Sequence, residues 1–240
     1  MRPAAPAAVF IQFWSPRRAY GMLSDPGSAA AALASAAAVC LAIILAAAGA
    51  GDFEGAAERY AEARSVELLE SGASQAEADS AVAAEVDAMR LSRRIEPFAM
   101  LLERCLIAAA AGTAAWGLGR SSRGGPGPGL HIAAASLAQG AYVVSAAASA
   151  LLAAVLTGSP AMPGLLALAG EPPASPGPLE TALLVAAGNV DLPSVVTVAV
   201  WGLGIAVVSS RRPLEGIRTA AAVYAAGVLL VSSLALAGRS

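Results

Sequence analysis

The sequence predicts an all-α protein, a polytopic membrane helix bundle with five transmembrane helices and a helical extramembrane loop. First, only 13% of the 240 residues are charged while 57% are hydrophobic, whereas soluble domains carry about a quarter charged residues. Second, five stretches meet or approach the length of about 20 apolar residues that a bilayer core requires. Third, half of the charged residues fall in one segment, residues 51–96. The charge deficit therefore belongs to the predicted spans and points to lipid.

The predicted spans are rich in alanine and glycine. They are residues 28–50, 97–118, 130–156, 190–208 and 219–237, the last continuing to the carboxyl terminus as segment 219–240. Small residues let helix backbones approach each other closely, so this composition suits tightly packed membrane helices. Alanine supplies 63 residues and all 15 basic residues are arginine, a bias typical of a GC-rich genome. We therefore expect a multi-pass protein of a bacterial inner (cytoplasmic) membrane.

The amino-terminal segment, residues 1–27, is predicted to be cytoplasmic and retained. Its apolar part is interrupted by Pro3 and Pro6, which is unlike the continuous apolar core of a cleaved signal peptide. Arg17 and Arg18 precede the first span, and arginines beside spans favour the cytoplasmic side.

The remaining connecting segments give the same orientation. A Gly/Pro linker, residues 119–129, and a short loop, residues 209–218, fall on the cytoplasmic side of this arrangement and contain further arginines. These residues are Arg120, Arg123, Arg211 and Arg212. We therefore expect a cytoplasmic amino terminus and an external carboxyl terminus. Arg90, Arg93 and Arg94 in the opposite loop argue against this orientation, but longer loops translocate despite their charge.

The acidic loop, residues 51–96, holds eleven acidic residues and five arginines. Ser71-Gly72 predicts the end of one helix, and Ser74 with Glu77 has the spacing of a capping box that begins another. Val82, Val86 and Met89 fall on one face of that second helix. The pattern predicts a two-helix extracytoplasmic cap whose charges form either a solvated face or a binding surface.

The segment 157–189 is predicted to be an outer loop. Six prolines lie between residues 158 and 180, around an apolar run too short to span a membrane. We expect irregular structure there.

Ionisable residues inside spans are the first candidates for function because their insertion is costly. Glu103 and Arg104 lie within the second span, and adjacent helix residues do not face each other. Asp191, at the start of the fourth span, is the natural partner of Arg104. The alternative is that all three lie at headgroup depth and snorkel.

Gln139 lies near the middle of the third span, close to Ser136 and Tyr142. A buried amide there serves either as a link between helices or as part of a transport route. His131, at the cytoplasmic end of the same span, is expected to be a polar anchor.

Catalytic and cofactor-binding patterns are absent from the sequence. It contains no Gly-x-Ser-x-Gly, no His-Glu-x-x-His and, without lysine, no phosphate-binding loop. Cys40 and Cys105 lie in apolar runs, where thiols behave as small hydrophobic groups. We expect no enzyme activity, cofactor or metal, and a net charge of −2 leaves no basic field for nucleic acid.

Two short motifs resemble the bacterial members of the Yip family, small five-span proteins related to the Rab-interacting Golgi proteins of eukaryotes. The first is Phe13-Trp14-Ser15-Pro16-Arg17-Arg18 ahead of the first span, and the second is Asp191-Leu192-Pro193-Ser194 followed by Gly204. The family has phenylalanine where Pro193 stands and tryptophan where Val196 stands. The resemblance implies five spans with a cytoplasmic amino terminus, but no settled activity for bacterial members.

The sequence leaves three functions open. The preferred one is a non-enzymatic membrane protein that scaffolds or organises other membrane proteins within the bilayer. The alternatives are an accessory subunit of one larger membrane complex and a small channel or transporter.

Overall fold

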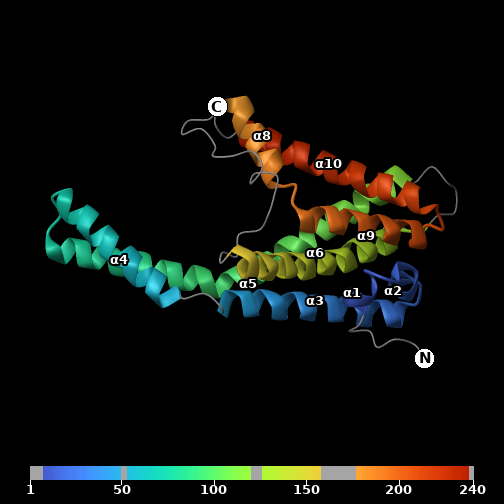
Figure 1. Ribbon diagram of the computed structural model, residues 1–240, viewed down its shortest axis with the longest axis horizontal. Coiled ribbons are helices and arrows are strands. Elements are labelled where there is room, and N and C mark those ends of the chain that lie inside the picture. Colours follow the sequence, from blue (N-terminus) through green and yellow to red (C-terminus); the bar gives the residue numbers. More distant parts are fainter. Residues whose placement is uncertain (1–7, 50–52, 120–125, 158–176, 238–240) are drawn as a thin grey trace. The chain divides into compact units, whose positions relative to one another are not determined.

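The computed structural model describes residues 8–49, 53–119, 126–157 and 177–237, and the regular elements in these ranges are helices (Figure 1). The chain divides into two compact units, one formed by residues 1–43 and 103–240 and the other by residues 44–102. The helices are α1 (Ala8–Ile11), α2 (Pro16–Gly21), the 3-10 turn η2 (Met22–Ser24), α3 (Pro26–Gly49), α4 (Phe53–Glu70), α5 (Gln75–Gly119), α6 (Pro128–Thr157), α8 (Pro178–Gly188), α9 (Leu192–Val208) and α10 (Pro213–Ala237). The predicted all-α class is therefore confirmed.

Four of these helices, α3, α5, α6 and α10, are long and apolar enough to cross a membrane by length and composition. Helix α9 has 17 residues, about 26 Å at the usual rise per residue, and is somewhat shorter than a typical bilayer core. Between 11% and 33% of each long apolar segment is buried. Most of their surface is therefore apolar and exposed, as a lipid-facing surface would be.

Helix α9 packs against α6, α10 and α2 in the first unit (Figure 1). Its contact with α10 is made by backbone. A Cβ on Gly202 would lie 2.4 Å from the Ile217 Cα atom, and one on Gly216 would lie 2.1 Å from the Gly202 carbonyl oxygen. Only glycine permits so close an approach. Helix α10 begins at Pro213, six residues before the predicted span, so the connection to α9 is a tight turn instead of the loop expected over 209–218.

The amino-terminal segment is part of the core, which the sequence did not predict. Helix α1 packs on α6 and helix α2 on α9, and both Gln12 and Tyr20 are completely buried. The Tyr20 hydroxyl donates to Gln12 Oε1 at 3.0 Å, and Gln12 Nε2 donates to the Leu137 carbonyl of α6 at 3.2 Å. Burial raises the pKa of the Tyr20 phenol. The Tyr20 hydroxyl therefore stays protonated and donates, and both the oxygen and the nitrogen of the Gln12 side-chain amide are hydrogen-bonded.

Gly204 provides the space for Tyr20. A Cβ at this position would lie 2.4 Å from the Tyr20 ring. The aromatic ring therefore packs directly on the α9 backbone, and a contact between residues 184 positions apart fixes α2 on the bundle.

The second unit is a hairpin of α4 and the first part of α5. Gly72, with φ of 95°, ends α4 through bonds from Gly72 N to the Leu69 carbonyl and from Ala73 N to the Leu68 carbonyl. Ser74 and Glu77 form the reciprocal bonds of a capping box at the start of α5. Both predicted signals are confirmed. A small core of buried Ala57, Val82 and Val86 joins the two helices.

Helix α5 continues for 45 residues through Pro97 and ends at Gly119. It therefore contains both the second helix of the hairpin and the predicted span 97–118. Pro97 has no N–H group, so one backbone hydrogen bond of the helix is missing at this position.

Residues 178–188 form helix α8, so the segment 157–189, predicted to be a loop, ends in a helix that the sequence did not predict. Pro178 occupies the first turn, where its missing N–H costs nothing, and Glu180 Oε2 accepts from the Gly177 amide at 2.9 Å. Residues 158–176 of that loop lie outside the described residues. Helix α8 packs on α10 and ends just before α9.

Substitution of Gly204 by alanine tests the packing of the amino-terminal segment. We expect Gly204→Ala to lower the free energy of unfolding in detergent by about 1–3 kcal/mol, because the added methyl group collides with the Tyr20 ring. Gly227→Ala on α10 is the control, since its Cβ meets nothing within 4 Å, and should raise stability by about 0.5–1 kcal/mol. Equal effects of the two substitutions in thermal or denaturant unfolding would contradict the packing of Tyr20 on Gly204.

Candidate functional site

Arg104 of α5, Tyr142 of α6 and Asp191 at the start of α9 form a polar cluster in the first unit, which we call the three-helix cluster. The Arg104 guanidinium lies over the Tyr142 ring, 4.2 Å from its centroid. The Tyr142 hydroxyl donates to Asp191 Oδ2 across a long 3.5 Å contact. One tyrosine thus contacts both a cation and an anion.

The position of Asp191 follows from the break between α8 and α9. Asp191 is the N-cap of α9, and its Oδ1 atom accepts from the Ser194 amide at 2.7 Å. Aspartate is preferred there because it satisfies a free amide and its charge is favourable at a helix N-terminus. The Tyr224 hydroxyl of α10 donates to the carbonyl of Asn189 in the same break. The break is therefore held by side chains from α6 and α10.

The predicted direct pairing of Arg104 with Asp191 is not found among the described residues. Each of the two side chains instead contacts Tyr142. Glu103 is exposed on another face of α5, as expected for adjacent helix residues. Asp191 lies at the start of α9, whereas Tyr142 lies near the middle of α6.

The cluster links helices by charge and π-electron contacts. A guanidinium over a tyrosine face contributes about 0.5–2 kcal/mol, the larger value when water is excluded. The Asp191 carboxylate is stabilised by the hydrogen bond from the Ser194 amide and by the positive end of the α9 dipole. The arrangement joins α5, α6 and α9 and partly compensates two charges that would be costly in lipid.

Gln139 lies in α6, one turn before Tyr142, and its Oε1 atom is buried without a hydrogen-bond partner among the described residues. Trp201 of α9 is 5% exposed, and its Nε1 atom likewise has no partner in the part of the chain that the structure describes. Ser136 is partly buried in the same helix. The structure places Gln139 inside the bundle but does not bring it to the three-helix cluster through any described bond.

The opposite end of α9 is also held by polar side chains. His131 is 3% exposed and links α6 to the α9 C-cap, with Nε2 3.1 Å from Ser209 Oγ and Nδ1 3.3 Å from the Gly127 carbonyl. The donor and acceptor assignment of the ring depends on its tautomer. The lone histidine is thus a buried link between helices, instead of the interfacial anchor that the sequence suggested.

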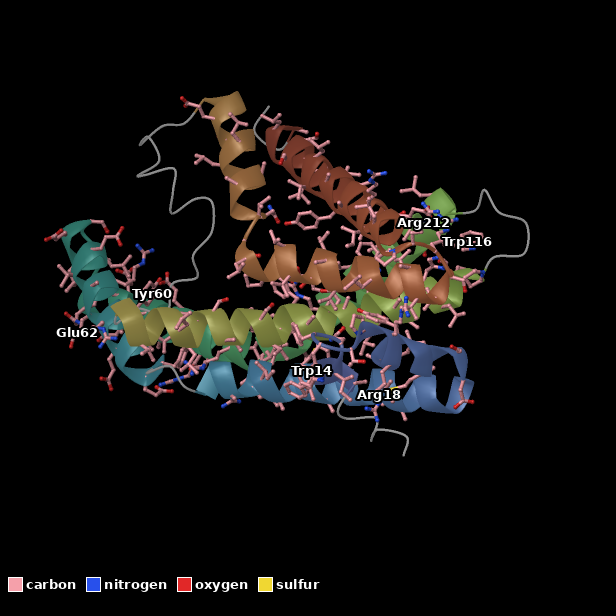
Figure 2. The ribbon with its side chains drawn as sticks, turned by 45° about the vertical axis from the view of Figure 1, so that its right-hand side comes forward. Trp14, Arg18, Tyr60, Glu62, Trp116 and Arg212 are labelled. Carbon is pink, nitrogen blue, oxygen red and sulfur yellow. The ribbon has the colours of Figure 1, made fainter. Side chains whose placement is uncertain are left out.

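Several of the predicted topology-setting arginines gather at this same end. Arg211 Nη2 donates to the Gly119 carbonyl at the end of α5 at 2.6 Å. Arg17 of α2 and Arg211 line one cavity, and Figure 2 shows Arg212 in the turn between α9 and α10. Arg18 is exposed on α2, and Arg120 and Arg123 lie outside the described residues. We call this region the arginine end of the bundle.

The hairpin of the second unit keeps part of its charge for internal contacts. The Tyr60 hydroxyl donates to Glu85 Oε2 at 2.6 Å, and Arg64 Nε lies 3.3 Å from the same oxygen. The Tyr60 bond and then the Arg64 bonds hold the pKa of the Glu85 carboxyl below its ordinary value. Arg90 pairs with Glu54 at 2.9 Å. These contacts join α4 to α5 on the outside of their small apolar core.

Other acidic side chains of the hairpin are exposed. Glu58, Glu62 and Glu70 lie on α4, and no ion pair is recorded for them within the described residues. Figure 2 shows Tyr60 and Glu62 on different sides of α4. The helix therefore uses one side to contact α5 and presents carboxylates on another.

Within the described ranges, no group of three or more histidine, cysteine or acidic residues is arranged to hold a metal ion. Comparison with protein-family models, with curated proteins and with solved structures finds no match for the chain.

A double-mutant cycle tests the contact between Arg104 and Tyr142. We expect Tyr142→Leu to lower the unfolding free energy in detergent more than Tyr142→Phe, because phenylalanine keeps the aromatic face under the guanidinium. Combined with Arg104→Gln, Tyr142→Leu should show a coupling of about 1 kcal/mol. Effects that add within about 0.3 kcal/mol would show that the two side chains do not interact.

The pH dependence of the hairpin follows from Glu85. Because its folded pKa is lowered, its contribution to stability is present above the ordinary glutamate pKa and is lost as the pH falls through the folded pKa. Spin labels are attached to cysteines at Ala63 and Ala84 in a chain without Cys40 and Cys105. The distribution of distances between the two labels should broaden below about pH 4.5. Glu85→Gln should weaken this pH response and Glu58→Gln should not. Identical profiles for wild type and Glu85→Gln would contradict the assignment.

Proposed function

We propose that this chain is a five-span integral protein of a bacterial inner membrane, with a cytoplasmic amino terminus, that organises or scaffolds other membrane proteins without catalysing a reaction. Four helices of suitable length and composition support the membrane location. The remaining predicted span, residues 190–208, corresponds to α9, which packs against two of those helices, α6 and α10. The resemblance to the Yip family is compatible with this proposal.

The proposed orientation is supported by the grouping of charge in the first unit. Arg17 and Arg211 line one cavity at the arginine end, where α5 ends and α6 begins. Arginine collects on the cytoplasmic side of membrane proteins. In this topology the segment 51–96, which follows the first span, would lie on the external side.

The proposal is supported mainly by a difference between the two units: polar side chains link helices in the bundle, whereas several carboxylates are exposed on the hairpin. In the bundle, Arg104, His131 and Arg211 each link one helix to another. In the hairpin, acidic side chains such as Glu58 and Glu62 are exposed and unpaired among the described residues. Such a division suits a stable membrane support that presents a charged surface to partners.

The break between α8 and α9 favours a transporter as the second candidate. Discontinuous helices with polar residues at the interruption line substrate routes in many transporters. Here Asp191 and Asn189 lie in the break, and the Gln139 Oε1 atom is buried without a partner among the described residues. An accessory subunit of one larger complex is a variant of the scaffolding proposal with a single partner.

Site-specific photo-crosslinking in native membranes tests the proposal. A photoreactive amino acid at Glu62 of the hairpin should capture defined membrane proteins, and the same group at Leu229, which is 67% exposed on α10, is the control for a lipid-facing position. Glu58→Gln should reduce crosslinking from position 62 severalfold without changing expression, because it removes surface charge and none of the described hairpin contacts.

The products distinguish the candidates. Several captured proteins support scaffolding, whereas one partner in fixed stoichiometry supports an accessory subunit. A chain that crosslinks to no protein from either position and purifies alone would contradict both. Ion or solute flux in liposomes that is lost in Gln139→Leu would then establish the transporter.

A further inference from the structure

We propose that the cavity between α2 and the α9–α10 turn is a binding site for a phosphate-bearing anion, supplied as the headgroup of an anionic phospholipid or as free phosphate. The cavity has a volume of about 700 Å³ and is lined by ten described residues, none of them acidic. Its volume is within the range of about 300–1,000 Å³ typical of small-ligand sites. The inference rests on the membrane insertion proposed above, at the arginine end.

Two arginines supply the positive charge of the site. Arg17 comes from α2 and Arg211 from the α9–α10 turn, so the charges reach the cavity from segments nearly 200 residues apart in the sequence. The guanidinium group presents donors in a planar fork that matches phosphate oxygens. A cavity that two arginines line, and whose described lining contains no carboxylate, favours an anion over a cation.

The backbone fixes the position of Arg211. Ser210 has a φ of 52°, and the Arg211 amide donates to the Ala206 carbonyl at 2.8 Å, which closes a Schellman turn after α9. The Arg211 side chain donates through Nη2 to the neutral Gly119 carbonyl. This bond orients the guanidinium, so the residue is preorganised.

The rest of the lining suits the apolar part of a lipid. Leu203 and Val207 of α9 face the cavity, and Trp14, 71% exposed, lies at the start of the segment that leads into α2. Figure 2 shows Trp14 and Arg18 together in this amino-terminal segment. Tryptophan is enriched at membrane interfaces, and basic cavities between helices at the cytoplasmic surface bind anionic headgroups. This combination favours the lipid as the source of the phosphate.

The experiment uses the full chain and compares two single-charge variants. Arg17→Gln removes a cavity charge, and Arg212→Gln removes a neighbouring exposed charge that does not line the cavity. The lipid arm is native mass spectrometry of protein released from nanodiscs of equal phosphatidylglycerol and phosphatidylcholine. The phosphate arm is calorimetric titration of the detergent-solubilised protein with sodium phosphate.

We expect preferential retention of phosphatidylglycerol, reduced about tenfold by Arg17→Gln and less than twofold by Arg212→Gln. Phosphate binding with the same variant dependence would assign the site to the free anion as well, and its absence would assign the site to lipid alone. Equal effects of the two variants, or no effect of Arg17→Gln in either arm, would overturn the proposal. Partner crosslinking at Glu62 is measured separately, so loss of one result does not imply loss of the other.

Discussion

The first unit depends on the close approach of helix α9 to its neighbours. Gly202 lets the backbones of α9 and α10 touch, and Gly204 lets the Tyr20 ring lie on the α9 backbone. In lipid, apolar burial does not drive helices together, so association depends on van der Waals packing and on hydrogen bonds between helices. Small residues at the contact positions of α9 are therefore the condition under which the other elements can assemble.

Polar links at both ends of α9 complement this packing. At one end, Asp191 caps the helix and contacts Tyr142, which also lies under the Arg104 guanidinium. At the other end, Ser209 contacts His131 of α6. The polar side chains of the bundle thus act at the ends of its central helix, where their bonds replace those that water would make.

The sequence predicted best those features that depend on local signals. Gly72 and the Ser74–Glu77 capping box specify the hairpin by contacts within a few residues, and apolar length specifies the long helices. The burial of Gln12 and Tyr20 could not be predicted in this way, because their partners, Leu137 and Gly204, are distant in sequence. Similarly, the sequence suggested that Arg104 pairs with Asp191, but nothing local indicated that each of them contacts Tyr142. Helix α8 was missed because the prolines before it dominate the local composition.

The central proposal is the topology, in which the segment before the first span lies in the cytoplasm and the loop 51–96 lies outside. The most direct measurement is the labelling of single cysteines in intact cells with a membrane-impermeant maleimide, after replacement of Cys40 and Cys105. Cysteine at Ser65 in the hairpin should be labelled in intact cells, whereas cysteine at Ser24, beside α2, should be labelled only after the membrane is permeabilised. The opposite pattern, or labelling of both positions in intact cells, would contradict the account.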